Sequence, residues 1–275
     1  MRPLLAVAAV ALMLPSGLAR AQRGAFDSDA EWLEHCRDQR WHDGDDRGRA
    51  CEVRDVPVKL AGRSLEVSGA PNGSVRAIGR DGDAVKVTAR IQADGRSDAD
   101  ARSRLADIRI VADGRSVRAE GPPRNGDDDG WSVSYVLEVP RRFDLALESR
   151  NGSLGVSGVS GTIELRATNG SVALSDVGGD VRAHTQNGSL NVQLSGKRWD
   201  GAGLDAETHN GSVRVRIPDD YSARLETHTV NGSLRTDFPV TVRGRISRDL
   251  TLPLGAGGAP IRVTTTNGSV TLTKS

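Results

Sequence analysis

Residues 166–194 read RATNGSVALSDVGGDVRAHTQNGSLNVQL, and one pattern of residues occurs twice within this stretch. The triplet Asn-Gly-Ser, followed by an aliphatic residue, stands at Asn169 and again 18 residues later at Asn187. On both sides of each triplet, aliphatic residues alternate with polar ones, which is typical of β-strands that have one buried face. Such repetition at a fixed period is typical of a repeat architecture.

The triplet recurs along most of the chain. From Asn151 onward the copies are 18, 18, 23, 21 and 36 residues apart. Because 36 is twice 18, we expect a copy that has lost its triplet near Arg248 and Asp249. The predicted turn residues are Asn72, Gly73, Asn151, Gly152, Asn169, Gly170, Asn187, Gly188, Asn210, Gly211, Asn231, Gly232, Asn267 and Gly268.

Two positions of the repeat are aliphatic in every copy from Asn151 onward. They lie six residues before and three residues after the Asn, and we predict that both face the core. Positions one, three and five before the Asn are mostly polar and are predicted to face outward. The predicted core residues are Leu145, Leu154, Ile163, Val172, Val181, Leu190, Leu204, Val213, Leu225, Leu234, Ile261 and Val270.

The triplet itself has two interpretations. Asn-Gly is favoured in tight turns because both residues tolerate positive φ, so Gly170→Val is expected to destabilise the fold by forcing a β-branched residue into a left-handed conformation. Each triplet also satisfies the Asn-x-Ser signal for N-glycosylation. We prefer turns to glycosylation, because turns explain more simply why the triplet recurs at the same point of each 18-residue strand repeat.

An 18-residue repeat with two turns predicts an all-β fold of one of two kinds. We favour a β-solenoid, similar to a single-stranded β-helix, in which each repeat forms one rung and equivalent residues stack about 4.8 Å apart. Stacking would also join the Asn side chains into a ladder. The alternative is an antiparallel meander or sandwich, but the C-terminal half contains no amphipathic helix to cover its apolar face.

The N-terminal part of the chain suggests export. Residues 1–21 have a positive charge, a short apolar run and a small-x-small ending, as in a secretory signal peptide. Residues 22–60 are predicted to be an N-terminal segment held by a Cys36–Cys51 disulfide, residues 61–144 a β-rich region with a short capping helix, and residues 145–275 the solenoid. Short helices are expected after Ser28 and after Ser97.

Composition argues against some functions. The 275 residues include 37 basic and 36 acidic ones, and aromatic residues make up only 3%. Nucleic-acid binding is not expected without a basic stripe and stacking aromatics. No cofactor and no transmembrane segment of the mature chain are predicted.

Two groups of outward side chains are candidates for chemistry. Glu148, Glu164, Glu207 and Glu226 could pair as acid and base in glycoside cleavage, but they alternate with Arg166, Arg182 and Arg262, which favours ion pairing between strands. His184, His209 and His228 are predicted to face outward, with His184 and His228 one intervening rung apart. We interpret them as solvated histidines rather than metal ligands, and we assign no catalytic or metal-binding residue.

The chain resembles a known family. The cysteine pair, WSVSYVLEVPRRFDL, the NGS(V/L) repeats, LSGKRWDGAGL, PDDYSARLETHTVNG and FPVTVRGRI are similar to a bacterial exported family of β-strand-repeat proteins of unknown function, named putative adhesins. Many relatives have Asn-Gly-Gly in place of Asn-Gly-Ser. The resemblance implies a β-helix-like fold and a location in the envelope or at the surface, and it brings no catalytic residues.

We therefore expect an exported, non-enzymatic scaffold, in the periplasm, at the cell surface or secreted, that presents polar β faces to a surface polymer or protein. The alternative is an enzyme that acts on a polysaccharide and is built on a β-helix.

Overall fold

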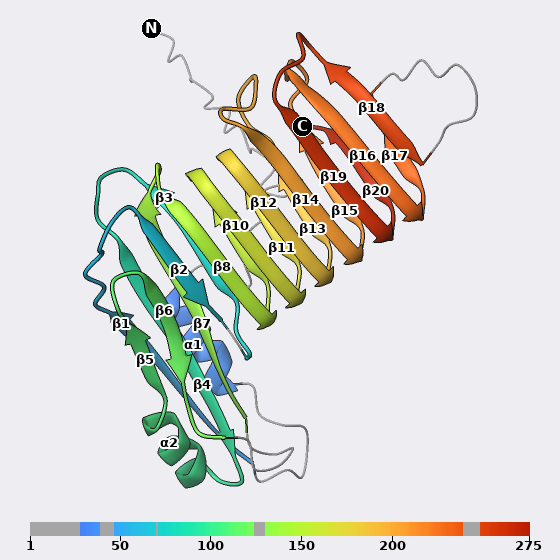
Figure 1. Cartoon of the computed structure of the whole chain (residues 1–275). Coiled ribbons are helices and arrows are strands. Elements are labelled where there is room, and N and C mark those ends of the chain that lie inside the picture. The colour runs from blue at the N-terminus through green and yellow to red at the C-terminus, as the bar shows by residue number, and fades with distance from the viewer. Residues whose placement is uncertain (1–27, 39–46, 70, 124–129, 239–247) are drawn as a thin grey trace, which may run out of the picture.

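The computed structural model describes residues 28–38, 47–69, 71–123, 130–238 and 248–275, which form two helices and twenty strands (Figure 1). The predicted signal peptide, residues 1–21, lies outside these ranges. The elements are α1 (Asp29–Asp38), β1 (Gly48–Val56), β2 (Ser64–Ser68), β3 (Val75–Arg80), β4 (Lys86–Gly95), α2 (Asp98–Ala106), β5 (Arg109–Ala112), β6 (Ser116–Glu120), β7 (Gly130–Pro140), β8 (Asp144–Asn151), β9 (Leu154–Ser157), β10 (Ser160–Asn169), β11 (Val172–Ser175), β12 (Gly178–Asn187), β13 (Leu190–Gln193), β14 (Gly203–Asn210), β15 (Val213–Ile217), β16 (Ala223–Asn231), β17 (Leu234–Thr236), β18 (Asp249–Leu254), β19 (Pro260–Asn267) and β20 (Val270–Lys274).

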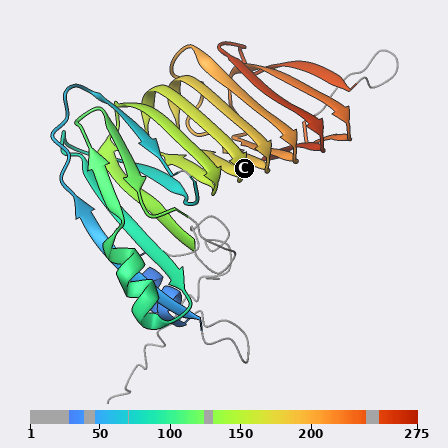
Figure 2. The same cartoon turned by 60° about the horizontal axis from the view of Figure 1, so that its bottom comes forward.

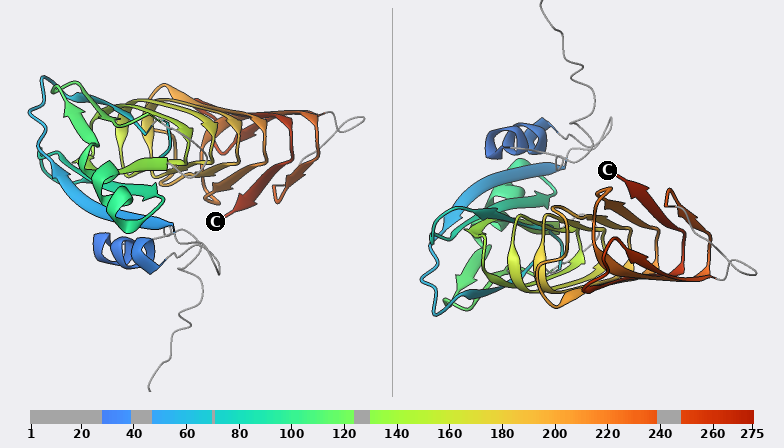
Figure 3. Two further views of the ribbon diagram at one scale, coloured as in Figure 1. Left: turned by 90° about the horizontal axis from the view of Figure 1, so that it is seen from below. Right: turned by 90° about the horizontal axis from the view of Figure 1, so that it is seen from above.

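The strands form two ten-stranded sheets that face each other (Figures 2 and 3). The first sheet has the order β1-β4-β7-β3-β9-β11-β13-β15-β20-β17, and the second has the order β18-β16-β19-β14-β12-β10-β8-β2-β6-β5. Each repeat contributes a longer strand to the second sheet, turns at its Asn-Gly-Ser triplet, and contributes a short strand to the first. The predicted all-β, solenoid-like fold is confirmed.

Neighbouring rungs are parallel and in register. Asn169 pairs with Asn151 on one side and with Asn187 on the other, so the triplets form one row along the coil. The same register places Val172 between Leu154 and Leu190 in the first sheet. Period-two alternation therefore sends the same positions of every repeat inward.

The order of the last rungs differs from the order of the chain. The C-terminal rung of β19 and β20 lies between the rung of β14 and β15 and the rung of β16 and β17 (Figure 1). The predicted extra copy near Arg248 and Asp249 is wrong. The described residues from Asp249 form β18, a single strand that pairs antiparallel with β16 at the end of the second sheet.

The predicted aliphatic columns fill the space between the sheets. All the predicted core residues are at most 3% exposed except Leu234, which is partly buried. Leu234 lies on β17, the edge strand of the first sheet, where the described residues form no further rung. Incomplete burial at this end is thus a consequence of its place in the stack.

The glycine of the triplet is required for a different reason from the one predicted. None of the described asparagines has a positive φ, and among the seven triplet glycines only Gly73 does, at 159°. A Cβ built on Gly170 would instead lie 2.0 Å from the carbonyl oxygen of Gly152, and one built on Gly188 would lie 2.1 Å from that of Gly170. Residues with left-handed φ lie at the second corner, for example Asp176 at 52° and Gly179 at 99°.

The remaining triplet side chains bond from rung to rung. Nδ2 of Asn169 donates to Oδ1 of Asn151 at 2.9 Å, and the same bond joins each later pair of rungs. Nδ2 is also the atom that a glycan would occupy, so glycosylation would break this ladder. Two residues before the Asn, a buried hydroxyl such as that of Thr185 donates to the glycine carbonyl of the preceding rung, here Gly170, at 2.7 Å. Ala167 occupies this position in one repeat.

Both predicted helices are present at the N-terminal end. Ser28 and Glu31 cap α1 reciprocally, and Ser97 Oγ accepts from the backbone N–H of Asp100 at the start of α2. The predicted Cys36–Cys51 disulfide is formed and joins α1 to β1. In the described part of the chain, neither helix has the length and apolar character that a membrane span requires.

Candidate functional site

The outer surface of the second sheet is the most highly charged regular surface of the repeats. Because strands alternate, positions three and five before each Asn point outward from β8, β10, β12, β14, β19 and β16. We call the surface formed by these positions the charged face. Its residues are Ala146, Glu148, Glu164, Arg166, Arg182, His184, Asp205, Glu207, Arg262, Thr264, Glu226 and His228.

Arg262, on the C-terminal rung, binds acidic side chains on both neighbouring rungs. Its Nη2 lies 2.9 Å from Oε2 of Glu226, and its Nη1 lies 3.7 Å from Oδ2 of Asp205. The hydrogen bond to Glu226 and the charges of both carboxylates raise the pKa of Arg262. The predicted pairing between strands is therefore present here, and it depends on the position of the C-terminal rung between the other two.

Other ion pairs lie within one strand or join adjacent rungs. Arg182 binds Asp180 of its own strand at 3.0 Å, and Arg166 contacts Glu164 in the same way. Nδ1 of His184 lies 3.8 Å from Oε2 of Glu207 on the next rung. Each of these side chains is at least 40% exposed, so each pair contributes little to stability. Their charged groups remain accessible to a partner.

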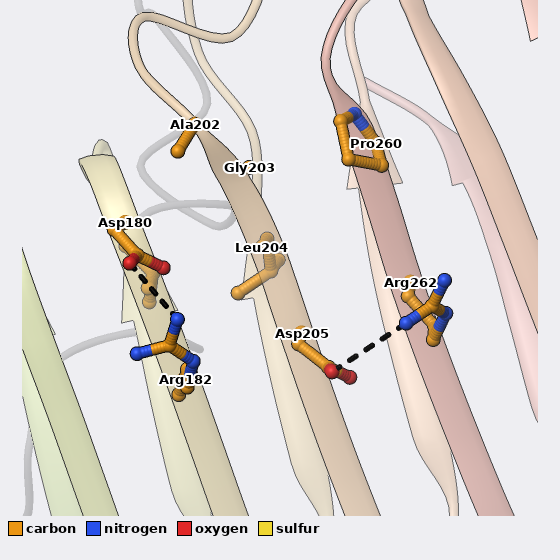
Figure 4. A pocket seen from close by; sticks show the side chains of 9 residues that line it. Asp180, Arg182, Ala202, Gly203, Leu204, Asp205, Pro260 and Arg262 are labelled. Atoms are coloured by element: carbon orange, nitrogen blue, oxygen red, sulfur yellow. Dashed lines mark hydrogen bonds and ion pairs between the residues drawn. The ribbon is translucent and has the colours of Figure 1, made fainter.

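A shallow depression of about 270 Å³ lies between Arg182 and Arg262 (Figure 4). Gly203 and Ala202 form part of it, and the absence of a side chain at Gly203 leaves room between the flanking strands. A second depression of about 240 Å³ shares Arg182 and Asp205 with the first and continues toward β10. Both are below the range of roughly 300–1,000 Å³ that is typical of small-molecule pockets. The face is better suited to an extended partner.

The three histidines do not gather. His184 and His228 are separated by two rungs, those of β14 and β19, and not by one as predicted, because the C-terminal rung lies between them. His228 contacts Asp249 of β18, and His209 is exposed beside the Asn ladder. Within the described ranges, no three His, Cys, Asp or Glu side chains are arranged to hold a metal ion.

The four glutamates lie on the charged face as predicted, but on different rungs. Glu226 is the least exposed of those in ion pairs, at 22%, because Arg224 and Arg262 both bind it. Glu207 faces His184. Of these two carboxylates, Glu226 is thus held between two guanidinium groups.

The outer surface of the first sheet is different in chemistry. Its short strands β9, β11, β13 and β20 present small or uncharged polar side chains, whereas Arg76 of β3, Arg214 and Arg216 of β15, and Arg235 of β17 add positive charges. We call this surface the neutral face, after its four uncharged strands β9, β11, β13 and β20. The coil therefore presents two flat surfaces of contrasting charge on opposite sides.

Two aromatic residues of the longer loops were not predicted to be in the core. Trp199 is 5% exposed, and its Nε1 donates to the carbonyl oxygen of Gly179 at 3.0 Å. Tyr221 is 3% exposed, and burial raises its pKa to about 12. The sequence could have indicated their burial, since an aromatic residue in an inserted loop of an aromatic-poor chain is a good candidate to cover the core.

Comparisons with known proteins give one family match and several distant structures. Residues 141–273 match the family described as Toastrack DUF4097. No curated protein matches the chain.

Among solved structures, a putative cell adhesion protein from Clostridium sporogenes is 8% identical, with a TM-score of 0.43, and the match covers 82% of this chain and 100% of that one. A putative adhesin from Bacteroides fragilis is 12% identical, with a TM-score of 0.40, covering 82% and 97% of the two chains. A putative lipid binding protein from Parabacteroides distasonis is 10% identical, with a TM-score of 0.29, covering 81% and 96%. No functional residue is transferred from these proteins.

The family match extends from the residues just before β8 to the last strand, so it includes the rungs from β8 onward and the whole charged face, but not the rung of β2 and β3 that carries Asn72. It confirms the predicted resemblance to a family of unknown function. Over residues 141–273, this chain is therefore similar to the family described as Toastrack DUF4097.

Proposed function

We propose that the protein is an exported, non-enzymatic scaffold, an adhesin or envelope-associated binding protein, whose charged face binds an extended extracellular polymer. The observation that carries this proposal is the flat row of exposed, oppositely charged side chains across six consecutive rungs. Parallel rungs repeat about every 4.8 Å, so the face offers many similar contacts to a polymer lying across the strands.

The geometry also favours binding over catalysis. The depressions at Arg182 and Arg262 are shallow, and Glu207 lines one of them. A glycosidase needs a positioned acid and base on either side of the bond that is cleaved. Binding by many weak, exposed contacts requires neither a cleft nor a proton donor.

We further propose that residues 1–21 direct export and that residues 22–60 and 61–144 hold the N-terminal end of the coil. The contacts that support this role are those of α2 with β1 and β4 and the disulfide between α1 and β1. The partner is an envelope or extracellular polymer or protein.

The experiment compares two matched double variants in binding to labelled cell-wall and capsular polysaccharides. Arg182→Ser with Arg262→Ser removes two positive charges from the charged face. Arg214→Ser with Arg216→Ser removes the same charge from the neutral face. The proposal expects retention of a polymer by the native chain and by the second variant, and at least about tenfold weaker retention by the first, since several contacts are lost together.

The same incubations test the alternative, an enzyme that acts on a polysaccharide. Release of shortened products that stops in Glu207→Gln or Glu226→Gln would establish catalysis and overturn the proposal. Equal loss of retention in both double variants would show that net charge, and not the charged face, is responsible.

A further inference from the structure

In the described part of the chain, the Asn ladder ends at Asn231 without a further rung to cover it, and this has a chemical consequence. An Asn followed by Gly can lose ammonia when the glycine nitrogen attacks the side-chain carbon Cγ. The attacking N–H gives up its proton, ammonia leaves with the former Nδ2, and a five-membered succinimide forms. Water then opens the ring to Asp or to isoaspartate. Gly favours this reaction because it has no side chain to hinder ring closure.

Six of the seven Asn-Gly pairs are held against this reaction by the next rung. The backbone N–H of Gly152, the nucleophile for Asn151, donates to the carbonyl oxygen of Asn169 at 3.1 Å, and Oδ1 of Asn151 accepts from Nδ2 of Asn169. The equivalent bonds hold the pairs that begin at Asn72, Asn169, Asn187, Asn210 and Asn267. Both bonds must break before the nitrogen can reach Cγ.

Asn231 lies on the outermost rung that the described residues form, and β18 beyond it pairs with β16 only from Ala223 to His228. Its Nδ2 donates to Oδ1 of Asn267 at 2.8 Å, but among the described residues nothing donates to its own Oδ1. The N–H of Gly232 likewise has no acceptor in the described part of the chain. Gly232 is exposed, whereas the other triplet glycines are buried or half-buried.

We propose that Asn231–Gly232 is the site of spontaneous deamidation in the folded protein and that the ladder protects the other six pairs. Conversion removes the hydrogen bond from Asn231 to Asn267 and adds one negative charge to the last rung. This inference does not depend on the proposed binding function.

The chain contains a matched internal control. Asn231 lies in the sequence Thr-Val-Asn-Gly-Ser, and Asn267 lies in Thr-Thr-Asn-Gly-Ser one rung further in. Trypsin releases them in Leu225–Arg235 and Val263–Lys274, and each peptide has a single Asn. Mass spectrometry of each peptide therefore reports one site.

The purified full chain is incubated at mildly alkaline pH, folded or in guanidinium chloride, and sampled over time. In the folded chain, Asn231 is expected to convert at least about tenfold faster than Asn267, because two inter-rung hydrogen bonds protect only the latter. In guanidinium chloride the two rates should agree within a few-fold. Equal rates in the folded chain, or faster conversion of Asn267, would overturn the proposal.

Val230→Thr makes the two local sequences identical from Thr to Ser. Val230 is 40% exposed, so this change should leave the fold intact. The preference for Asn231 must persist in this variant. If it disappears, the preceding residue and not the ladder controls the rate, and the proposal is wrong.

Discussion

Gly170→Ala tests why the corner of each rung contains glycine. The added Cβ would lie 2.0 Å from the carbonyl oxygen and 2.5 Å from the carbonyl carbon of Gly152, which belongs to the preceding rung. Because these are backbone atoms at the centre of a hydrogen-bonded corner, they cannot rotate away. The two rungs must separate by more than 1 Å to restore an ordinary contact of about 3.4 Å.

The magnitude follows from the bonds that this separation stretches. Gly152 N–H donates to the oxygen of Asn169 at 3.1 Å, Leu154 N–H donates to that of Ser171 at 3.0 Å, and Nδ2 of Asn169 donates to Oδ1 of Asn151 at 2.9 Å. At about 1 kcal/mol for each bond, we expect a loss of about 2–4 kcal/mol in the free energy of unfolding.

Urea unfolding followed by circular dichroism measures this loss, and Gly155→Ala is the matched control. A Cβ on Gly155, on the neutral face, would have nothing closer than Arg76 Cγ at 3.8 Å. The free energy of unfolding of this variant should be unchanged or up to about 1 kcal/mol higher, because the unfolded chain loses conformational freedom.

Gly170→Asn separates steric contact from backbone conformation. If the corner needed a left-handed residue, Asn would be tolerated better than Ala. The structure predicts that Asn is at least as destabilising as Ala. A stability close to that of the native chain in Gly170→Ala or Gly170→Asn would refute the steric explanation.

Three further predictions concern other parts of the fold. Thr227→Val should raise the free energy of unfolding by about 0.5–2 kcal/mol, since the buried Thr227 hydroxyl has no hydrogen-bond partner among the described residues; a lower urea midpoint would contradict this. Arg214→Cys with Thr271→Cys should form an intramolecular disulfide, because these positions pair across adjacent rungs. Arg214→Cys with Arg235→Cys should not form one, because the rung of Thr271 lies between them. The opposite result would show that the rungs stack in the order of the chain. Tyr221 has a folded pKa raised to about 12, so it retains its proton when the unfolded chain loses it, and stability should fall as pH rises from about 10 to 12. Tyr221→Phe should reduce this alkaline loss, and an unchanged pH profile of the urea midpoint would argue against it.

The local pattern in the sequence was sufficient to predict the rung. Alternation with a period of two identifies which residues of a strand face the core, and the 18-residue repeat aligns those residues in columns. The columns, the parallel stacking and the Asn ladder depend only on short-range spacing that is the same in every copy. The caps of both helices and the disulfide were also predicted, because Ser28, Ser97 and the two cysteines have specific local chemistry.

The order of the rungs was decided by tertiary structure. Leu225 and Ile261 occupy the same column, and each carries an Asn-Gly-Ser triplet six residues later, so either repeat could stack on the rung of Leu204. The spacing of residues in the sequence does not distinguish the repeat of Leu225 from the repeat of Ile261 as the neighbour of that rung. The position of the C-terminal rung in turn fixes the neighbours of Arg262 and the separation of His184 from His228.

The role of the triplet glycine was also beyond the sequence. Asn-Gly is common in turns with positive φ, and the same dipeptide suits a corner where two backbones approach closely. Sequence alone determined that a residue without a side chain was needed at each corner. Only the stacking of Gly170 on Gly152 shows that the reason is close contact between rungs. These two residues are 18 positions apart in the sequence, so they come into contact only in the folded coil.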